Sequence, residues 1–168
     1  VLPYAHIFGL TVDMLTPMCL GMSLCVLGLP PIPKYLRDAF TQLHPRSFFA
    51  VPLILSKYTE AILGELINSD EGRAKLADYE NHPDFCAHLR EVLIGSMGGR
   101  MELFATGGAA IPFELESLLA FKIRMPFITG YGMTESAPVI SLGPDANYKP
   151  RSCGKVYEDY LEVKIASP

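Results

Sequence analysis

Charged side chains are scarce in this 168-residue sequence, and they do not gather into clusters of one sign. Only 19% of the residues are charged, the formal net charge is -4, and no run of Lys and Arg is present. A nucleic-acid-binding surface needs clustered cations to neutralise phosphates. The sequence therefore argues against a nucleic-acid partner. Because 49% of the residues are hydrophobic, it predicts a folded domain with a full core.

Metal-binding cysteine patterns are also missing. The four cysteines, Cys19, Cys25, Cys86 and Cys153, show no CxxC spacing, and none has a nearby His in the pattern of a zinc site. We therefore expect no zinc centre. We expect reduced, mostly buried thiols of the kind that cytosolic proteins carry.

A continuous membrane-spanning helix is missing as well, although one stretch comes close. Met14–Pro33 has no charged residue and approaches the ~20 residues that a spanning helix needs. Proline and glycine interrupt it repeatedly, so one unbroken helix is a poor description. We expect instead a buried helix, a turn at Gly21 and a short buried strand at Ser23–Leu27. The pattern predicts a soluble, cytoplasmic protein and leaves peripheral membrane association open.

Internal boundaries are absent too. We find no signal peptide, internal repeat, low-complexity tract or flexible linker, so residues 1–168 are expected to form a single unit. The chain opens on Val1-Leu2-Pro3 rather than Met and ends within a predicted strand, Leu161–Ile165. From this we expect a piece of a longer protein. The oligomeric state is not indicated.

Hydrophobic periodicity alternates between helices and strands along the chain. Each apolar strand-like run is followed by a segment with helical spacing, which predicts an α/β fold with a mainly parallel, doubly wound sheet flanked by helices. Ligands of such sheets bind at the carboxyl ends of the strands. Besides the two strands named above, the predicted strands are 47–51, 101–105 and 127–131. The predicted helices are 34–43, 53–67, 84–93 and 112–121, with a surface turn and a short helix within 68–83.

The turn after the strand at 101–105 is Thr106-Gly107-Gly108-Ala109-Ala110-Ile111-Pro112. Paired glycines let a backbone approach a ligand closely, and the helix that follows begins with unpaired N–H groups. A planar base or a phosphate fits such a turn. A tight turn that needs glycine for its dihedral angles alone is the structural alternative.

The turn after the strand at 127–131 has more telling residues. Tyr131 offers a flat face for a base, Thr134 a hydroxyl for a phosphate oxygen, and Glu135 a carboxylate for Mg²⁺. In the alternative reading, Thr134 or Ser136 caps a helix and Glu135 is a solvated carboxylate in its first turn. The residue types alone do not separate the two readings.

These two turns resemble the motifs of the adenylate-forming (AMP-binding) superfamily, which includes acyl-CoA synthetases, adenylation domains and luciferases. Tyr131-Gly132-Met133-Thr134-Glu135 is similar to the superfamily signature, and Thr106-Gly107-Gly108-Ala109 to its adenine-binding turn. The resemblance implies part of the large N-terminal domain of such an enzyme. It implies catalytic roles for Thr134 and Glu135, Mg²⁺ binding by Glu135, and ATP or adenylate binding by Gly107, Gly108, Ala109, Ala110, Tyr131, Gly132, Met133 and Thr134.

Three further segments extend the resemblance over nearly the whole chain. Leu2–Gly9 is similar to the motif that opens the acyl pocket, Pro45–Pro52 to the long-chain fatty-acid branch, and Ser152–Val156 to the family's Gly-Lys segment. His6 and Gly130 are implied to line the acyl or pantetheine passage. For His6 the alternative is a packing role beside aromatic residues.

One departure from the long-chain branch follows Pro52. The chain has Leu53, Ile54 and Leu55 where those enzymes usually carry an Arg or a bulky aromatic residue near the pocket mouth. This argues against a gated long-chain tunnel. It still predicts an aliphatic lining that suits an apolar acyl group.

By this resemblance the parent protein is a long-chain fatty-acid:CoA ligase, which forms acyl-AMP from a carboxylic acid and ATP and passes the acyl group to CoA. The implied partners are small molecules: fatty acid, ATP with Mg²⁺, and CoA. The family's upstream Gly-rich Ser/Thr loop with its Lys, its downstream Asp and its C-terminal domain are not in this sequence, so we expect the chain alone to be inactive. The alternatives are an adenylation domain for a medium-chain, aryl or amino acid, and a non-catalytic nucleotide- or partner-binding module.

Overall fold

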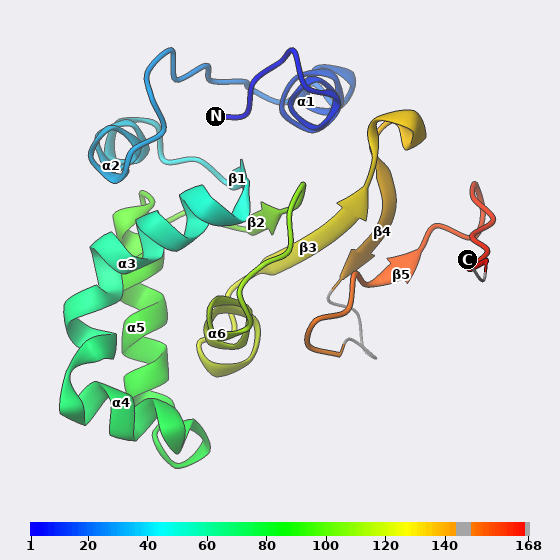
Figure 1. Ribbon diagram of the computed structural model, residues 1–168. Helices are drawn as coiled ribbons and strands as arrows, with labels where there is room; N and C mark the ends of the chain where they lie inside the picture. Colours follow the sequence, from blue (N-terminus) through cyan, green and yellow to red (C-terminus); the bar gives the residue numbers. More distant parts are fainter. Residues whose placement is uncertain (144–148, 167–168) are drawn as a thin grey trace.

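The centre of the molecule is one mixed β-sheet. In the computed structural model, which describes residues 1–143 and 149–166, five strands lie side by side in chain order (Figure 1). The first three run parallel, whereas the last two are antiparallel to their neighbours. The strands are β1 Ser47–Ala50, β2 Leu103–Thr106, β3 Phe127–Gly132, β4 Val139–Gly143 and β5 Lys155–Val156.

The predicted α/β class is confirmed, and the strands predicted at 47–51, 101–105 and 127–131 form as β1, β2 and β3. The sheet is mixed rather than mainly parallel because β4 follows β3 after a tight turn, and a short turn can join only antiparallel strands. Neither β4 nor β5 was predicted.

Helices flank this sheet close to where they were predicted. Three of them begin with proline, whose fixed φ suits the first helical turn and whose missing N–H is not needed there. The side chain of Ser69 caps α4 by accepting a hydrogen bond from the N–H of Gly72 at 2.9 Å. The helices are α2 Pro33–Leu43, α3 Pro52–Asn68, α4 Asp70–Ala77, α5 Pro83–Ser96 and α6 Phe113–Glu116, which continues as a π-helical turn, Ser117–Lys122.

An aromatic series crosses the core from α2 to β3. The ring of Phe48 stacks on Phe104 with centroids 5.5 Å apart, and both meet further rings edge-on. Phe104 is fully buried at the centre of this series. Apolar residues of α3 and α5 close the core from one side: Leu55, Tyr58, Leu63, Leu89 and Leu93.

The N-terminal region differs from the prediction. A π-helical segment, Gly9–Leu15, continues into α1, Thr16–Cys19, and the chain then turns at Gly21, where φ is +66°. The predicted strand Ser23–Leu27 does not form, and Leu24 and Val26 are exposed. The strand prediction at Leu161–Ile165 is also wrong. Both runs have strand-like composition, but no strand in the described part of the chain pairs with them.

The cysteines and the long uncharged stretch can both be compared with the predictions. Cys86 is buried, and burial raises the pKa of its thiol. Cys19, Cys25 and Cys153 are exposed, so the prediction of mostly buried thiols was wrong. Among the described residues, no helix is long and apolar enough to cross a membrane.

The aromatic core gives a stability prediction. Phe104→Ala should lower the free energy of unfolding by about 3–5 kcal/mol, because it removes a fully buried ring and leaves a cavity. Leu53→Ala is the control: Leu53 is 63% exposed on α3, so its truncation should change stability by less than about 0.5 kcal/mol. Urea denaturation measures both changes, and equal losses would contradict the packing described for Phe104.

Candidate active site

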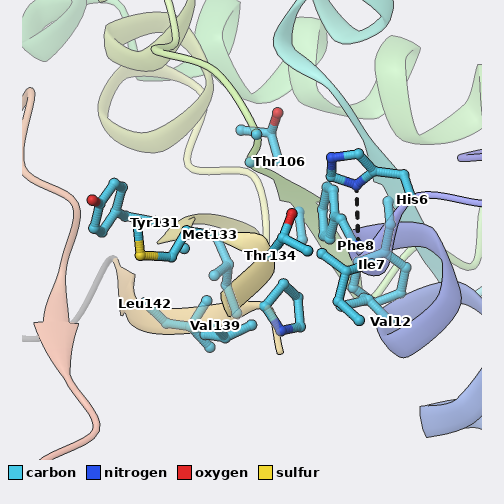
Figure 2. A pocket seen from close by; sticks show the side chains of 18 of the residues that line it. His6, Ile7, Phe8, Val12, Thr106, Tyr131, Met133, Thr134, Val139 and Leu142 are labelled. Atoms are coloured by element: carbon cyan, nitrogen blue, oxygen red, sulfur yellow. Dashed lines mark hydrogen bonds between the residues drawn. The ribbon is translucent and has the colours of Figure 1, made fainter. Parts of the chain in front are cut away.

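The turns that follow β2 and β3 meet at one edge of the sheet. Parallel pairing places Thr106, the last residue of β2, opposite Thr129 in β3. β2 therefore ends beside the middle of β3, which continues to Gly132, and both turns follow the carboxyl ends of these strands, where ligands of α/β sheets bind. Together with the N-terminal segment and β4, these turns line a cavity of about 400 Å³ (Figure 2).

The first turn is held close to β3 and needs glycine. The hydroxyl of Thr106 donates a hydrogen bond to the carbonyl oxygen of Ala50 at 2.8 Å, which ties the end of β2 to β1. A Cβ on Gly107 would lie 3.1 Å from the carbonyl oxygen of Gly130, tighter than side chains normally allow. Gly108 has a φ of +81°, a conformation that favours glycine. At Gly107 and Gly108 the backbone itself therefore borders the cavity, without side chains in between.

The second turn is closed by its own hydrogen bonds. The N–H of Met133 donates to the carbonyl oxygen of Pro138 at 3.0 Å. The hydroxyl of Ser136 lies 2.8 Å from that same oxygen and 3.1 Å from the N–H of Met133, for which it is an acceptor. A Cβ on Gly132 would overlap the Pro138 carbonyl. Ser136 and Gly132 thus shape the turn.

The other polar groups of the second turn remain available. Thr134 and Glu135 are exposed at the cavity, and neither side chain forms a hydrogen bond or ion pair with the described residues. Tyr131 and Met133 are each 48% exposed and also line the cavity. The rim therefore offers a hydroxyl, a carboxylate and an aromatic face to a ligand.

The N-terminal segment forms the opposite wall, as Figure 2 shows for His6, Ile7, Phe8 and Val12. The N–H of Phe8 donates to Nδ1 of His6 at 3.1 Å, the contact marked in the figure. Because Nδ1 accepts this bond, the neutral ring carries its proton on Nε2. The Phe8 ring comes within 3.7 Å of the Cβ position of Gly107, so this wall closes on the first turn.

Most residues predicted for the site lie around this single cavity. His6, Gly107, Gly108 and every residue from Gly130 to Glu135 line it. Ala109 and Ala110 are exposed and are not part of the lining.

Leu53, Ile54 and Leu55 do not line the cavity either, which corrects the expectation of an aliphatic lining there. They lie on α3, where Leu55 packs in the core and Leu53 faces solvent.

Sequence reasoning missed several apolar residues of the cavity. Val12 lies beyond the motif recognised at Leu2–Gly9, and Leu103 and Ile128 were taken only as strand residues. Val139 and Leu142 belong to β4, and its pairing with β3 brings them to the site. The segment Val139–Gly143 is short and has no polar alternation, so only this pairing marks it as a wall. The missed lining residues are Val12, Phe49, Leu103, Ala105, Ile128, Pro138, Val139 and Leu142.

A cavity at the carboxyl ends of parallel strands, lined by two close-fitting glycine turns and an apolar wall, defines an α/β ligand-binding domain. The chain belongs to the AMP-binding enzyme family, whose pattern matches residues 1–168. The resemblance to adenylate-forming enzymes noted in the sequence is thereby confirmed at the level of the family.

Two sequence relatives are enzymes of known name. The chain is 22% identical to luciferin 4-monooxygenase of Photuris pensylvanica over 173 residues, which cover 100% of this chain and 25% of the relative. It is 34% identical to 4-coumarate-CoA ligase 2 of Narcissus pseudonarcissus over 76 residues, 42% of this chain and 13% of that protein. The chain thus spans a quarter or less of the length of these relatives.

Solved structures of CoA ligases share the fold. A benzoate CoA ligase from Burkholderia xenovorans LB400 superposes with a TM-score of 0.62 at 14% identity, over 91% of this chain and 25% of that one. A long-chain-fatty-acid-CoA ligase from Archaeoglobus fulgidus gives a TM-score of 0.52 at 17% identity, over 87% and 25%. At these identities the likeness concerns the fold alone.

The packing of the second turn gives a prediction at Gly132. Gly132→Ala should lower the free energy of unfolding by about 2 kcal/mol or more, because the added Cβ overlaps a backbone carbonyl that cannot move without opening the turn. Gly95→Ala is the matched control. Gly95 lies in α5 with open space around its Cβ position, so alanine there should stabilise by up to about 1 kcal/mol. Thermal unfolding compares the two variants, and equal behaviour would contradict the close approach at Gly132.

Proposed function

We propose that the full-length protein carrying this chain is an ATP-dependent acid:CoA ligase. It activates a carboxylic acid as acyl-AMP with release of pyrophosphate, and the thiol of CoA then takes the acyl group. The observation that carries this proposal is the meeting of the two glycine turns and an apolar wall in one cavity. It supports the proposal because the polar turns and the apolar wall border the same space, so a nucleotide and an acyl group could lie next to each other.

We assign the polar rim to the nucleotide. In this proposal the bare backbone at Gly107 and Gly108, with the exposed ring of Tyr131, seats the adenosine. Ala109 and Ala110 belong to the same turn and are exposed to solvent. The Thr134 hydroxyl forms no hydrogen bond with the described residues, and we propose that it hydrogen-bonds a phosphate oxygen.

Glu135 is proposed to hold Mg²⁺ together with the phosphates. The described residues contain no cluster of three or more His, Cys, Asp or Glu side chains that could hold a metal ion on their own. This fits Mg²⁺, which proteins often bind through one or two carboxylates while phosphates and water supply the other ligands. Glu135 is exposed at the cavity rim and has no described partner, so its carboxylate is available for this role. When bound, the ion supplies positive charge to the phosphates.

In the proposed reaction, catalysis depends mainly on how the acid and ATP are positioned. An acid carboxylate that attacks a phosphate chain brings negative charges together, and a rate increase must come from alignment and from cations near the phosphates. We assign alignment to the glycine turns, whose backbone packs closely against Gly130 at Gly107 and against Pro138 at Gly132.

The apolar wall supports an apolar acyl group, and we propose a fatty acid. Phe8, Val12, Phe49, Val139 and Leu142 face the cavity, and its described lining contains no Lys or Arg to pair with a second carboxylate. An aryl acid is the second candidate. It is supported by the aromatic ring of Phe8 and by the 34% identity with a 4-coumarate-CoA ligase over part of the chain.

ATP–pyrophosphate exchange by the full-length protein tests the reaction and the acid together. With acetate, octanoate, palmitate, benzoate and 4-coumarate as substrates, exchange should be fastest with octanoate or palmitate, because these acids bury the most apolar surface against the wall. The isolated chain, assayed in parallel, should show none. Exchange with benzoate or 4-coumarate alone would replace the fatty acid by an aryl acid. No exchange with any acid would favour a nucleotide- or partner-binding module.

The role of Glu135 has its own test. Glu135→Ala should lower the exchange rate about a hundredfold, on the order of 3 kcal/mol, and raise the Mg²⁺ concentration needed for half-maximal rate. Glu91→Ala, which removes an exposed carboxylate from α5, controls for the change in net charge. If both variants keep the parental rate and Mg²⁺ dependence, Glu135 has no such role.

A further inference from the structure

Glu116, on α6, is the only acidic side chain that is fully buried among the described residues, with 0% exposure. Its Oε2 accepts a hydrogen bond from the backbone N–H of Arg151 at 2.9 Å. A carboxylate removed from water is strongly destabilising unless hydrogen bonds compensate it. The burial of Glu116 is therefore linked to the chain segment that reaches it, 35 residues later in the sequence.

Arg151 contacts α6 a second time, through its side chain. The guanidinium carbon lies 4.9 Å from the ring centroid of Phe113, which is on the same helix as Glu116. Arg151 also has a φ of +66°, a left-handed conformation that residues other than glycine seldom adopt. Such a conformation persists where the surroundings hold it. Here α6 holds Arg151 by backbone and side chain together.

The residues after Arg151 fit closely against β4. We refer to Arg151–Val156 as the 151–156 segment, which leads into β5 at the edge of the sheet (Figure 1). The hydroxyl of Ser141 donates to the carbonyl oxygen of Cys153 at 2.7 Å. At Gly154, where φ is +81°, a Cβ would overlap the carbonyl group of Leu142. Lys155 then pairs opposite Leu142.

On its other side β4 forms a wall of the cavity. Leu142 and Val139 line it, and Ser141 pairs opposite Tyr131 of β3. A continuous series of contacts thus runs from the buried Glu116 through the 151–156 segment to the apolar wall.

We propose that Glu116 is a positioning residue for the acid substrate: by anchoring the 151–156 segment to α6, it fixes β4 and its apolar side chains at the cavity. The kinetic part of this proposal rests on the proposed ligase function. The mechanical part, that Glu116 immobilises β4, does not depend on that function.

The test uses four variants of the full-length protein. Glu116→Leu removes the acceptor and replaces it with an apolar side chain of similar size. Glu116→Met is a second apolar variant with a more adaptable side chain. Glu116→Gln retains an oxygen that can accept from Arg151. Glu114→Ala, two residues away on the exposed side of α6, is the control.

Two measurements are made on each variant: backbone hydrogen exchange of residues 139–143, and the KM values for acid and ATP in pyrophosphate exchange. Glu116→Leu and Glu116→Met should speed hydrogen exchange at 139–143 about tenfold, the size of effect expected when the buried hydrogen bond to Arg151 is lost. They should also raise the KM for the acid about tenfold and change the KM for ATP less. Glu116→Gln and Glu114→Ala should resemble the parent protein.

If both apolar variants show the hydrogen-exchange rate of the parent protein at 139–143, the proposal is overturned. It is also overturned if hydrogen exchange becomes faster while the KM for the acid stays unchanged. If Glu116→Gln changes the hydrogen-exchange rate and the KM for the acid as much as Glu116→Leu does, the hydrogen bond to Arg151 is excluded as the cause of these changes. If the parent protein shows no pyrophosphate exchange with any acid, the ligase function fails instead. Hydrogen exchange at 139–143 then still decides whether Glu116 holds β4.

Discussion

The close approach of the first glycine turn to β3 is the constraint on which the site depends. A Cβ on Gly107 would lie 3.1 Å from the Gly130 carbonyl oxygen, so the first turn fits this close to β3 because Gly107 has no side chain. The hydrogen bond from Thr106 to Ala50 adds a fixed relation to β1. The three parallel strands thus fix the positions of both turns. The N-terminal segment and β4 form the remaining walls of the cavity.

The parallel half of the fold could be predicted because its signals are local. Each of α2, α3 and α5 has helical spacing of apolar residues and a proline at its start, and β1 to β3 are apolar runs between helices. The N-terminal apolar stretch has equally strong local signals, and there the prediction of a strand at Ser23–Leu27 failed. An apolar run becomes a strand when another strand pairs with it, and composition does not contain that information.

The same distinction explains which part of the candidate site was foreseen. The glycine turns carry their own signal, since glycine pairs after a strand are unusual and require a close approach or a positive φ. Val139 and Leu142 carry none, because they reach the cavity only through the antiparallel pairing of β4 with β3. Phe49 is similar: it lies in a predicted strand, but its place at the cavity follows from the pairing of β1 with β2. In this chain, the turns at the rim of the cavity could therefore be found from the sequence, whereas the apolar residues of its walls could not.

The second turn separates residues that shape it from residues that are free to act. The sequence allowed Thr134 or Ser136 to cap a helix and Glu135 to be a solvated carboxylate in its first turn. In the structure the Ser136 side chain bonds the turn, through Met133 and Pro138. Gly132 provides the space that this closure needs. The side chains of Thr134 and Glu135 form no hydrogen bond or ion pair within the described residues, so the hydrogen bonding of the turn does not account for these two residue types. A hydroxyl and a carboxylate at the rim of a cavity, on a turn whose hydrogen bonds do not involve their side chains, fit the nucleotide contacts proposed for them.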